Sequence, residues 1–139
     1  MKSLICGAGM AALVLALAAV APTNASADDP ADVGTIMTKL FAGKNSPNNA
    51  LKAAAKSDSP DWAKVKEASE VFSKFAPDLA RNEPPQGDKD SWERLAKALA
   101  DHAAALRDVA DKQDADQLKA TVKALGSSCK ACHDVHRPE

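Results

Sequence analysis

The sequence predicts an all-α fold with four main helices. Apolar residues recur at spacings of three and four along most of the 139-residue chain, which is the period of a helix with one buried face. Alternation of β-branched or aromatic residues, the pattern of a strand, never lasts for four residues. Clusters rich in Gly, Pro and Asn separate the helical stretches, as expected for the loops between helices.

Residues 1–27 have the features of a cleaved secretory signal. A positive start precedes an apolar run over residues 8–21, and the small-x-small cleavage pattern Ala-Ser-Ala follows at residues 25–27. The apolar run is shorter than the ~20 residues of a membrane-spanning helix, so a membrane anchor is the weaker alternative. We therefore expect a periplasmic protein with one domain, residues 28–139, that loses Cys6 with the signal and has no membrane partner.

The charges of the chain nearly cancel. Lys and Arg together number 18 and Asp and Glu 19, which gives a formal net charge of −1. So balanced a chain has no basic stripe for nucleic acid, and we expect no such partner. Three cysteines are too few for a fold built on disulfides. No residues suggest a nucleophile or an acid/base pair, so an enzyme is not expected.

The first helix is expected from about Ala31 to Ala42. Gly43 and the Asn-rich residues 45–49 end it, and a short alanine-rich helical turn should cover Ala50 to Lys56. The inward face of the first helix has the spacing i, i+3, i+4, i+7 and comprises Val33, Ile36, Met37 and Leu40.

The second helix is expected to begin after Ser59 as N-cap, with Pro60 at its first position. Pro77 can kink its last turn. Its predicted inward face comprises Trp62, Val65, Phe72, Ala76 and Leu79.

Residues 82–90, NEPPQGDKD, have the composition of a loop, and Asp90 with Glu93 resembles a capping box at the start of the third helix. A break at Lys112-Gln113 ends this helix, and Asp114 should cap the fourth. The inward face of the third helix is expected to comprise Trp92, Leu95, Leu99, His102, Leu106 and Val109.

The fourth helix carries the most specific motif of the chain. Its apolar stripe continues without a change of phase from Leu118 through Val122 and Leu125 to Cys129 and Cys132. Both thiols should therefore face the bundle interior, one turn apart. His133 lies four residues after Cys129 and nearly on the same side. This spacing is the C-x-x-C-H pattern of covalent heme c attachment, with the two cysteines bonded to the porphyrin and the histidine bonded to iron.

Three alternative roles of these residues fit less well. A dithiol redox centre normally lies at a helix N-terminus beside a sheet, whereas this motif lies at a helix C-terminus. A zinc site could use Cys129, Cys132, His133 and His136, although structural zinc sites join two separated ligand pairs. Chance occurrence would leave two free thiols without a use in an oxidising compartment.

The segment CKACHDVHR, residues 129–137, resembles the cytochrome c-prime family, including its low-spin, methionine-ligated members. The resemblance implies an antiparallel four-helix bundle with one heme c bound covalently near the C-terminal end of the fourth helix. It also implies a basic residue near the heme edge four positions after the proximal His133, and Arg137 matches that position. Residues 43–60 depart from the long continuous first helix that is usual in the family.

In such an antiparallel bundle the start of the first helix faces the end of the fourth, which makes Met37 the expected distal iron ligand. Core packing is the alternative role for this methionine. His102 is a second candidate distal ligand. It should lie opposite about Ala124, roughly one turn short of the motif, and a hydrogen bond to a backbone carbonyl or a position at the edge of the stripe suits it better. We expect His136 to be solvated or near a heme propionate.

These observations predict an exported monoheme c-type cytochrome that transfers electrons through a His/Met-ligated heme to redox partner proteins. The alternative is a five-coordinate cytochrome c-prime that binds nitric oxide or carbon monoxide. Many relatives form dimers through their first two helices, so a homodimer is a further expectation.

Overall fold

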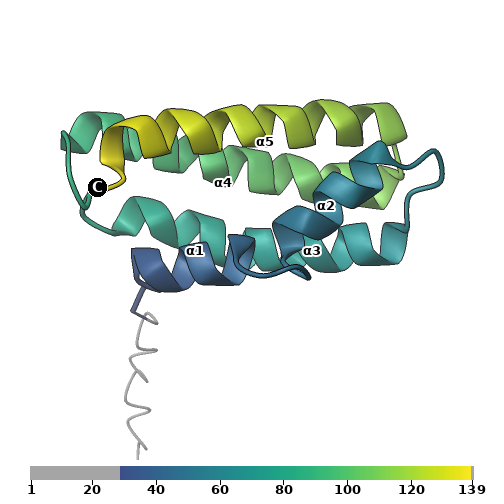
Figure 1. The fold of residues 1–139 in the computed structure, drawn as a ribbon, viewed down its shortest axis with the longest axis horizontal. Helices are drawn as coiled ribbons and strands as arrows, with labels where there is room; N and C mark the ends of the chain where they lie inside the picture. The colour runs from purple at the N-terminus through teal and green to yellow at the C-terminus, as the bar shows by residue number, and fades with distance from the viewer. Residues whose placement is uncertain (1–28, 139) are drawn as a thin grey trace, which may run out of the picture.

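The computed structural model describes residues 29–138, which form a bundle of helices (Figure 1). This part of the chain contains no strand, and the predicted all-α class is confirmed. Within the same residues, no helix is both long and apolar enough to cross a membrane. The signal predicted for residues 1–27 lies outside the described residues and stays a prediction.

The first arm of the bundle consists of two short helices. Helix α1 spans Val33–Phe41, and the Asp32 side chain caps it by accepting from the Thr35 backbone N–H. The chain then turns at Gly43, whose φ of 83° is favourable only without a side chain. Helix α2 spans Pro47–Lys56, so it begins three residues earlier than expected. The predicted interruption of the first helix is confirmed.

The second arm joins an α-helix to a 3₁₀ helix. Helix α3 spans Trp62–Phe75, and the 3₁₀ helix η1 follows over Ala76–Arg81. The change at Ala76 lies next to Pro77, where a kink was expected. The predicted N-cap Ser59 is wrong, because Asp61 occupies the cap position and accepts from the Lys64 N–H.

Two long antiparallel helices complete the bundle. Helix α4 spans Lys89–Lys112 and helix α5 spans Ala115–His136. Asp88, not Asp90, is the N-cap of α4, because its carboxylate accepts from the backbone N–H of Ser91 at 2.8 Å. The break before α5 is confirmed: Gln113 is left-handed with φ 53° and Asp114 caps α5.

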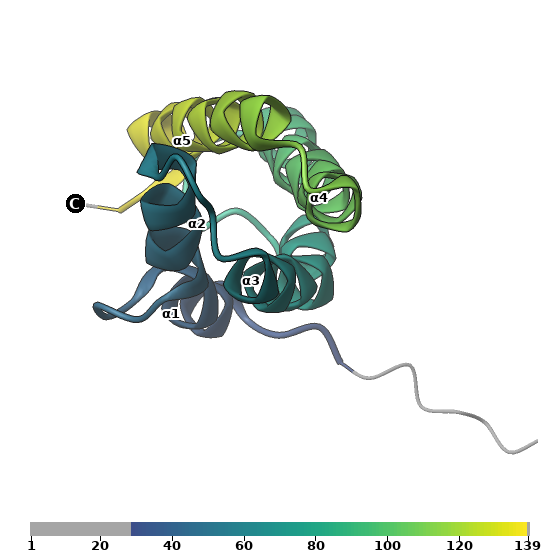
Figure 2. The same cartoon turned by 90° about the vertical axis from the view of Figure 1, so that its right-hand side faces the viewer.

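The helices pack around one core, but they do not all meet. Helix α4 packs against α3, η1 and α5, and α2 packs against α3 and α5 (Figure 2). Helix α1 packs against α2, α3 and η1, while none of its Cα atoms comes within 8 Å of a Cα atom of α5. The largest fully buried apolar side chains are Phe72, Ile36, Leu40, Leu51, Leu79, Leu106, Leu118, Leu125, Val65 and Val109.

The cap at the start of α5 gives a test of this architecture. The Asp114 carboxylate accepts from the backbone N–H groups of Asp116 and Gln117, so Asp114→Ala should lower the free energy of unfolding by about 1 kcal/mol. Chemical denaturation measures this change. Asp116→Ala is the control and should cost less, because its exposed side chain contributes only a favourable interaction with the helix dipole and a 3.9 Å surface ion pair with Lys119. Equal losses for the two variants would contradict the assigned cap.

Candidate functional site

The packing of α5 turns its two cysteines toward the interior. Leu118 and Leu125 are buried on α5 with 0% and 1% exposure, and Cys129 and Cys132 continue the same stripe. Both cysteines are half-buried and pack against the hydrophobic core. The inward orientation predicted from the helical spacing is therefore what the structure has.

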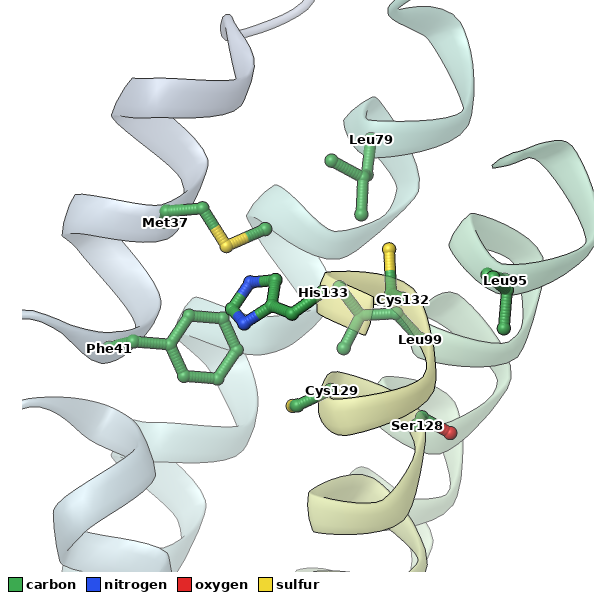
Figure 3. Close-up of a pocket in the computed structure, with 9 residues that line it drawn as sticks. All are labelled: Met37, Phe41, Leu79, Leu95, Leu99, Ser128, Cys129, Cys132 and His133. Carbon is green, nitrogen blue, oxygen red and sulfur yellow. The ribbon is translucent and has the colours of Figure 1, made fainter. Parts of the chain in front are cut away.

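An apolar cavity lies at this end of α5, between elements distant in sequence (Figure 3). Its volume is about 50 Å³. Helices α1, α4 and α5 and the 3₁₀ helix η1 contribute its walls, which are formed by Met37, Phe41, Leu79, Leu95, Leu99, Ser128, Cys129, Cys132 and His133.

A larger cleft of about 380 Å³ adjoins this cavity. The two spaces share four lining residues: Met37, Phe41, Cys132 and His133. The cleft is also lined by Arg137, an exposed residue at the C-cap of α5. The apolar cavity thus continues into the cleft, and the Arg137 guanidinium borders that cleft.

Met37 and His133 approach this space from different helices. Met37 comes from α1, is half-buried, and directs its side chain toward the His133 imidazole (Figure 3). His133 comes from the last turn of α5 and is exposed, because the cleft beside it is open. The structure therefore brings both predicted iron ligands and both predicted attachment cysteines to one cavity.

The electrostatics of the thiols do not suit a dithiol redox centre. Burial raises the pKa of the Cys129 thiol, and the nearby Lys52 charge only partly opposes this shift. Burial also raises the pKa of Cys132, and the neighbouring Cys129 raises it further. Reactive cysteines have lowered pKa values, because the thiolate is the nucleophile. The raised pKa values keep both thiols protonated at neutral pH, so neither is an activated nucleophile.

His102 does not reach the cavity. Its Nε2 lies 2.9 Å from Oγ of Ser128, so its partner is a hydroxyl on α5 and not the expected backbone carbonyl. The residue opposite His102 is also one turn nearer to the cysteines than Ala124, the position expected from equal distances to the turn. Ser128 lines the cavity, so His102 contacts the site only through this side chain.

The prediction of a solvated His136 is wrong. This imidazole is 2% exposed, with Nε2 2.7 Å from Oγ of Ser91 and Nδ1 2.7 Å from the Gln86 carbonyl. It also meets the Trp92 ring edge-to-face, with 5.3 Å between the ring centroids. Gln86 lies in the loop before α4, whereas Ser91 and Trp92 lie in the first turn of α4. The spacing of residues on α5 did not indicate any of these contacts.

A zinc site at the motif also lacks support. Among residues 29–138, no group of three or more His, Cys, Asp or Glu side chains is arranged to hold a metal ion. His136, the fourth ligand that such a site would need, is turned to Ser91 and Gln86.

Comparison with known proteins agrees with the C-terminal motif. Residues 87–137 match the family model of cytochrome c'. Over this segment, the chain is similar to cytochrome c'. A cytochrome c' of Alcaligenes xylosoxydans xylosoxydans is 40% identical over 50 residues, which are 36% of this chain and 39% of that protein. The matched region thus spans well under half of the curated relative. No solved structure matches the chain.

A cytochrome c' is by its name a heme protein of the c type. The residues at the cavity fit such a heme. The Cys129 and Cys132 thiols can each form a thioether with it, and the His133 imidazole can bind its iron. The apolar walls, together with the open cleft beside them, suit a flat macrocycle that is largely hydrocarbon and has an acidic edge.

Sequence reasoning missed part of the cavity wall. Phe41 lies four residues after Met37, so helical spacing could have placed it on the same side of α1. Leu79 was expected to be in the core but not at the site, because the path of η1 is not readable from local pattern.

The loop that holds His136 gives a second test. Gly87 has φ 82°, and a Cβ there would lie 2.8 Å from Nδ1 of His136. Gly87→Ala should therefore lower the free energy of unfolding by about 2 kcal/mol, through backbone strain and a disturbed hydrogen bond. Thermal or chemical denaturation measures the loss.

Gly126→Ala is the matched control, because a Cβ at this position in α5 meets nothing within 4 Å. Alanine favours a helix over glycine, so this variant should gain about 0.5–1 kcal/mol. If both substitutions stabilised the protein, the close approach of Gly87 to His136 would be refuted.

Proposed function

We propose that the protein is an exported monoheme cytochrome that transfers electrons through a heme with His133 and Met37 as its axial ligands. The observation that carries this proposal is the shared cavity, where Met37 lines the wall from α1 while Cys129, Cys132 and His133 line it from α5. A thioether opposite an imidazole raises the reduction potential of heme iron and occupies its sixth position. Such a heme passes electrons and resists small gases.

The packing of α1 supports Met37 as a ligand. No Cα atom of α1 comes within 8 Å of a Cα atom of α5, yet Met37 and the motif line the same cavity. Met37 packs against the core and also lines both the cavity and the adjoining cleft, so its sulfur is within reach of a group bound there.

The alternative function is binding of nitric oxide or carbon monoxide at a five-coordinate iron. The apolar walls around Phe41, Leu79 and Leu99 favour it, because they could shelter a small uncharged gas. The two functions differ in one contact, the bond between the Met37 sulfur and iron.

The partners and the compartment follow from this proposal. Covalent heme attachment and the signal-like residues 1–27 support an exported, periplasmic protein. Redox proteins would approach the open cleft, where Arg137 is the basic residue expected near the heme edge. A homodimer formed through the first two helices expected from the sequence, which correspond to α1 and α3, is also part of the proposal.

Covalent attachment is tested by extraction. The protein produced together with a heme-attachment system should keep its colour after denaturation and acid-acetone treatment, because thioether bonds survive both. The Cys129→Ser, Cys132→Ser double variant should release its heme. Cys6→Ser is the control and should retain it, since Cys6 lies in the predicted signal. Heme that is extractable from the unaltered protein would overturn the attachment.

The distal ligand is tested by replacing Met37. The unaltered oxidised protein should show the weak near-infrared charge-transfer band of a sulfur–iron bond, and its reduced form should bind carbon monoxide slowly. Met37→Ala should remove the band, bind carbon monoxide readily and lower the reduction potential, because the thioether that favours ferrous iron is lost.

Met37→Leu is the matched variant, since it keeps the apolar volume and removes only the sulfur. It should behave as Met37→Ala does, whereas His102→Ala should leave the spectrum unchanged. A high-spin, gas-binding unaltered protein would favour the alternative function. If His102→Ala were the substitution that opened the iron, Met37 would not be the ligand.

A further inference from the structure

One residue, Asn82, joins the two sides of the candidate heme site. It is the C-cap of η1 and is half-buried. Its side-chain amide donates to the carbonyls of Ala31 and Asp78, both at 2.9 Å. Its own backbone carbonyl accepts from Nε1 of Trp92 at 2.8 Å. The side chain thus holds the segment before α1, and the main chain holds α4.

The segment before α1 is held at both of its backbone groups. Ala31 accepts from Asn82 and donates its N–H to Oδ2 of Asp78 at 3.1 Å. Asp32, the next residue, caps α1, and Met37 follows within that helix. The start of the helix that carries Met37 is therefore fixed to η1 by two hydrogen bonds.

Trp92 links Asn82 to the end of α5, which forms the other side of the site. This buried indole packs edge-to-face on the buried His136 imidazole, which lies three residues after His133 on α5. The end of α5 and the start of α1 are therefore linked through one junction. Between α1 and α5 themselves, no pair of Cα atoms lies within 8 Å.

Helix α1 depends on such links for its position. It has nine residues, and an isolated helix shorter than about 12–15 residues is marginal in water. Its place must come from tertiary contacts with α2, α3 and η1. The hydrogen bonds to η1 are the ones that anchor its first turn.

We propose that Asn82 is a positioning residue that holds Met37 opposite His133 by anchoring the start of α1. This inference rests on the proposed His/Met ligation for its spectroscopic test, although the anchoring of α1 can be tested without it. Loss of the Asn82 side chain would let α1 move away from α5 and would weaken the sulfur–iron bond, while leaving heme attachment intact.

The test is Asn82→Ala in the heme-loaded protein. This variant removes both side-chain hydrogen bonds and keeps the backbone carbonyl that accepts from Trp92. The near-infrared sulfur–iron band should weaken, the reduction potential should fall, and carbon monoxide uptake should rise about fivefold, the factor that corresponds to one net hydrogen bond. Amide hydrogen exchange in residues 33–41 should accelerate by a similar factor.

Asp114→Ala is the matched control for lost stability. Its cap lies at the opposite end of the bundle from the C-terminus of α5 (Figure 1), and it should leave the band, the potential and gas uptake unchanged. If Asn82→Ala does not fold, Asp78→Ala, which removes the other bond to Ala31, takes its place and should give the same changes.

The outcomes separate the two proposals. If Met37→Ala removes the band but Asn82→Ala changes neither band nor gas uptake, the positioning role is overturned and the His/Met function stands. If the unaltered protein lacks the band, the His/Met function fails. Amide hydrogen exchange in residues 33–41 of the Asn82→Ala variant then tests whether Asn82 anchors α1. Unchanged exchange in residues 33–41 would then overturn the role of Asn82 as well.

Discussion

Leu118 and Leu125 hold α5 against the core in one helical phase, and that phase turns Cys129 and Cys132 toward the interior. A rotation of α5 by one residue, about 100°, would carry both thiols away from the cavity. The contacts of Ser128 with His102 and of His136 with Trp92 fix the same rotation along the rest of the helix. The geometry of the site is therefore a consequence of ordinary core packing on a helix far longer than the motif itself.

The two helices of the first arm, α1 and α2, contact different parts of the bundle. Helix α1 ends at Phe41, the chain turns at Gly43, and α2 begins at Pro47. Helix α2 packs against α5, whereas no Cα atom of α1 lies within 8 Å of a Cα atom of α5. The two helices therefore have different contacts: α2 packs against α5, and α1 contributes Met37 and Phe41 to the cavity wall.

Much of this arrangement could be predicted from local pattern, because helical period and end signals act over a few residues. The break at Gln113, the phase of α5 and the shared location of Met37 and the C-x-x-C-H motif all follow from spacing and from antiparallel topology. What could not be predicted depends on partners far apart in sequence. His136 meets residues 45 and 50 positions away, and Asn82 reaches Ala31 across 51 positions.

The burial of His136 also affects which imidazole of α5 is available to a heme iron. Two imidazoles three residues apart on one helix could compete for the same iron. Because the Gln86 carbonyl can only accept, Nδ1 of His136 carries the proton, and Nε2 is left to the Ser91 hydroxyl, so neither nitrogen is available. Freeing this ring would cost two hydrogen bonds and an aromatic contact, about 3 kcal/mol in all, or a roughly 100-fold bias against it. Gln86 in the loop before α4, together with Ser91 and Trp92 on α4, thus holds His136 away from the cavity that His133 lines.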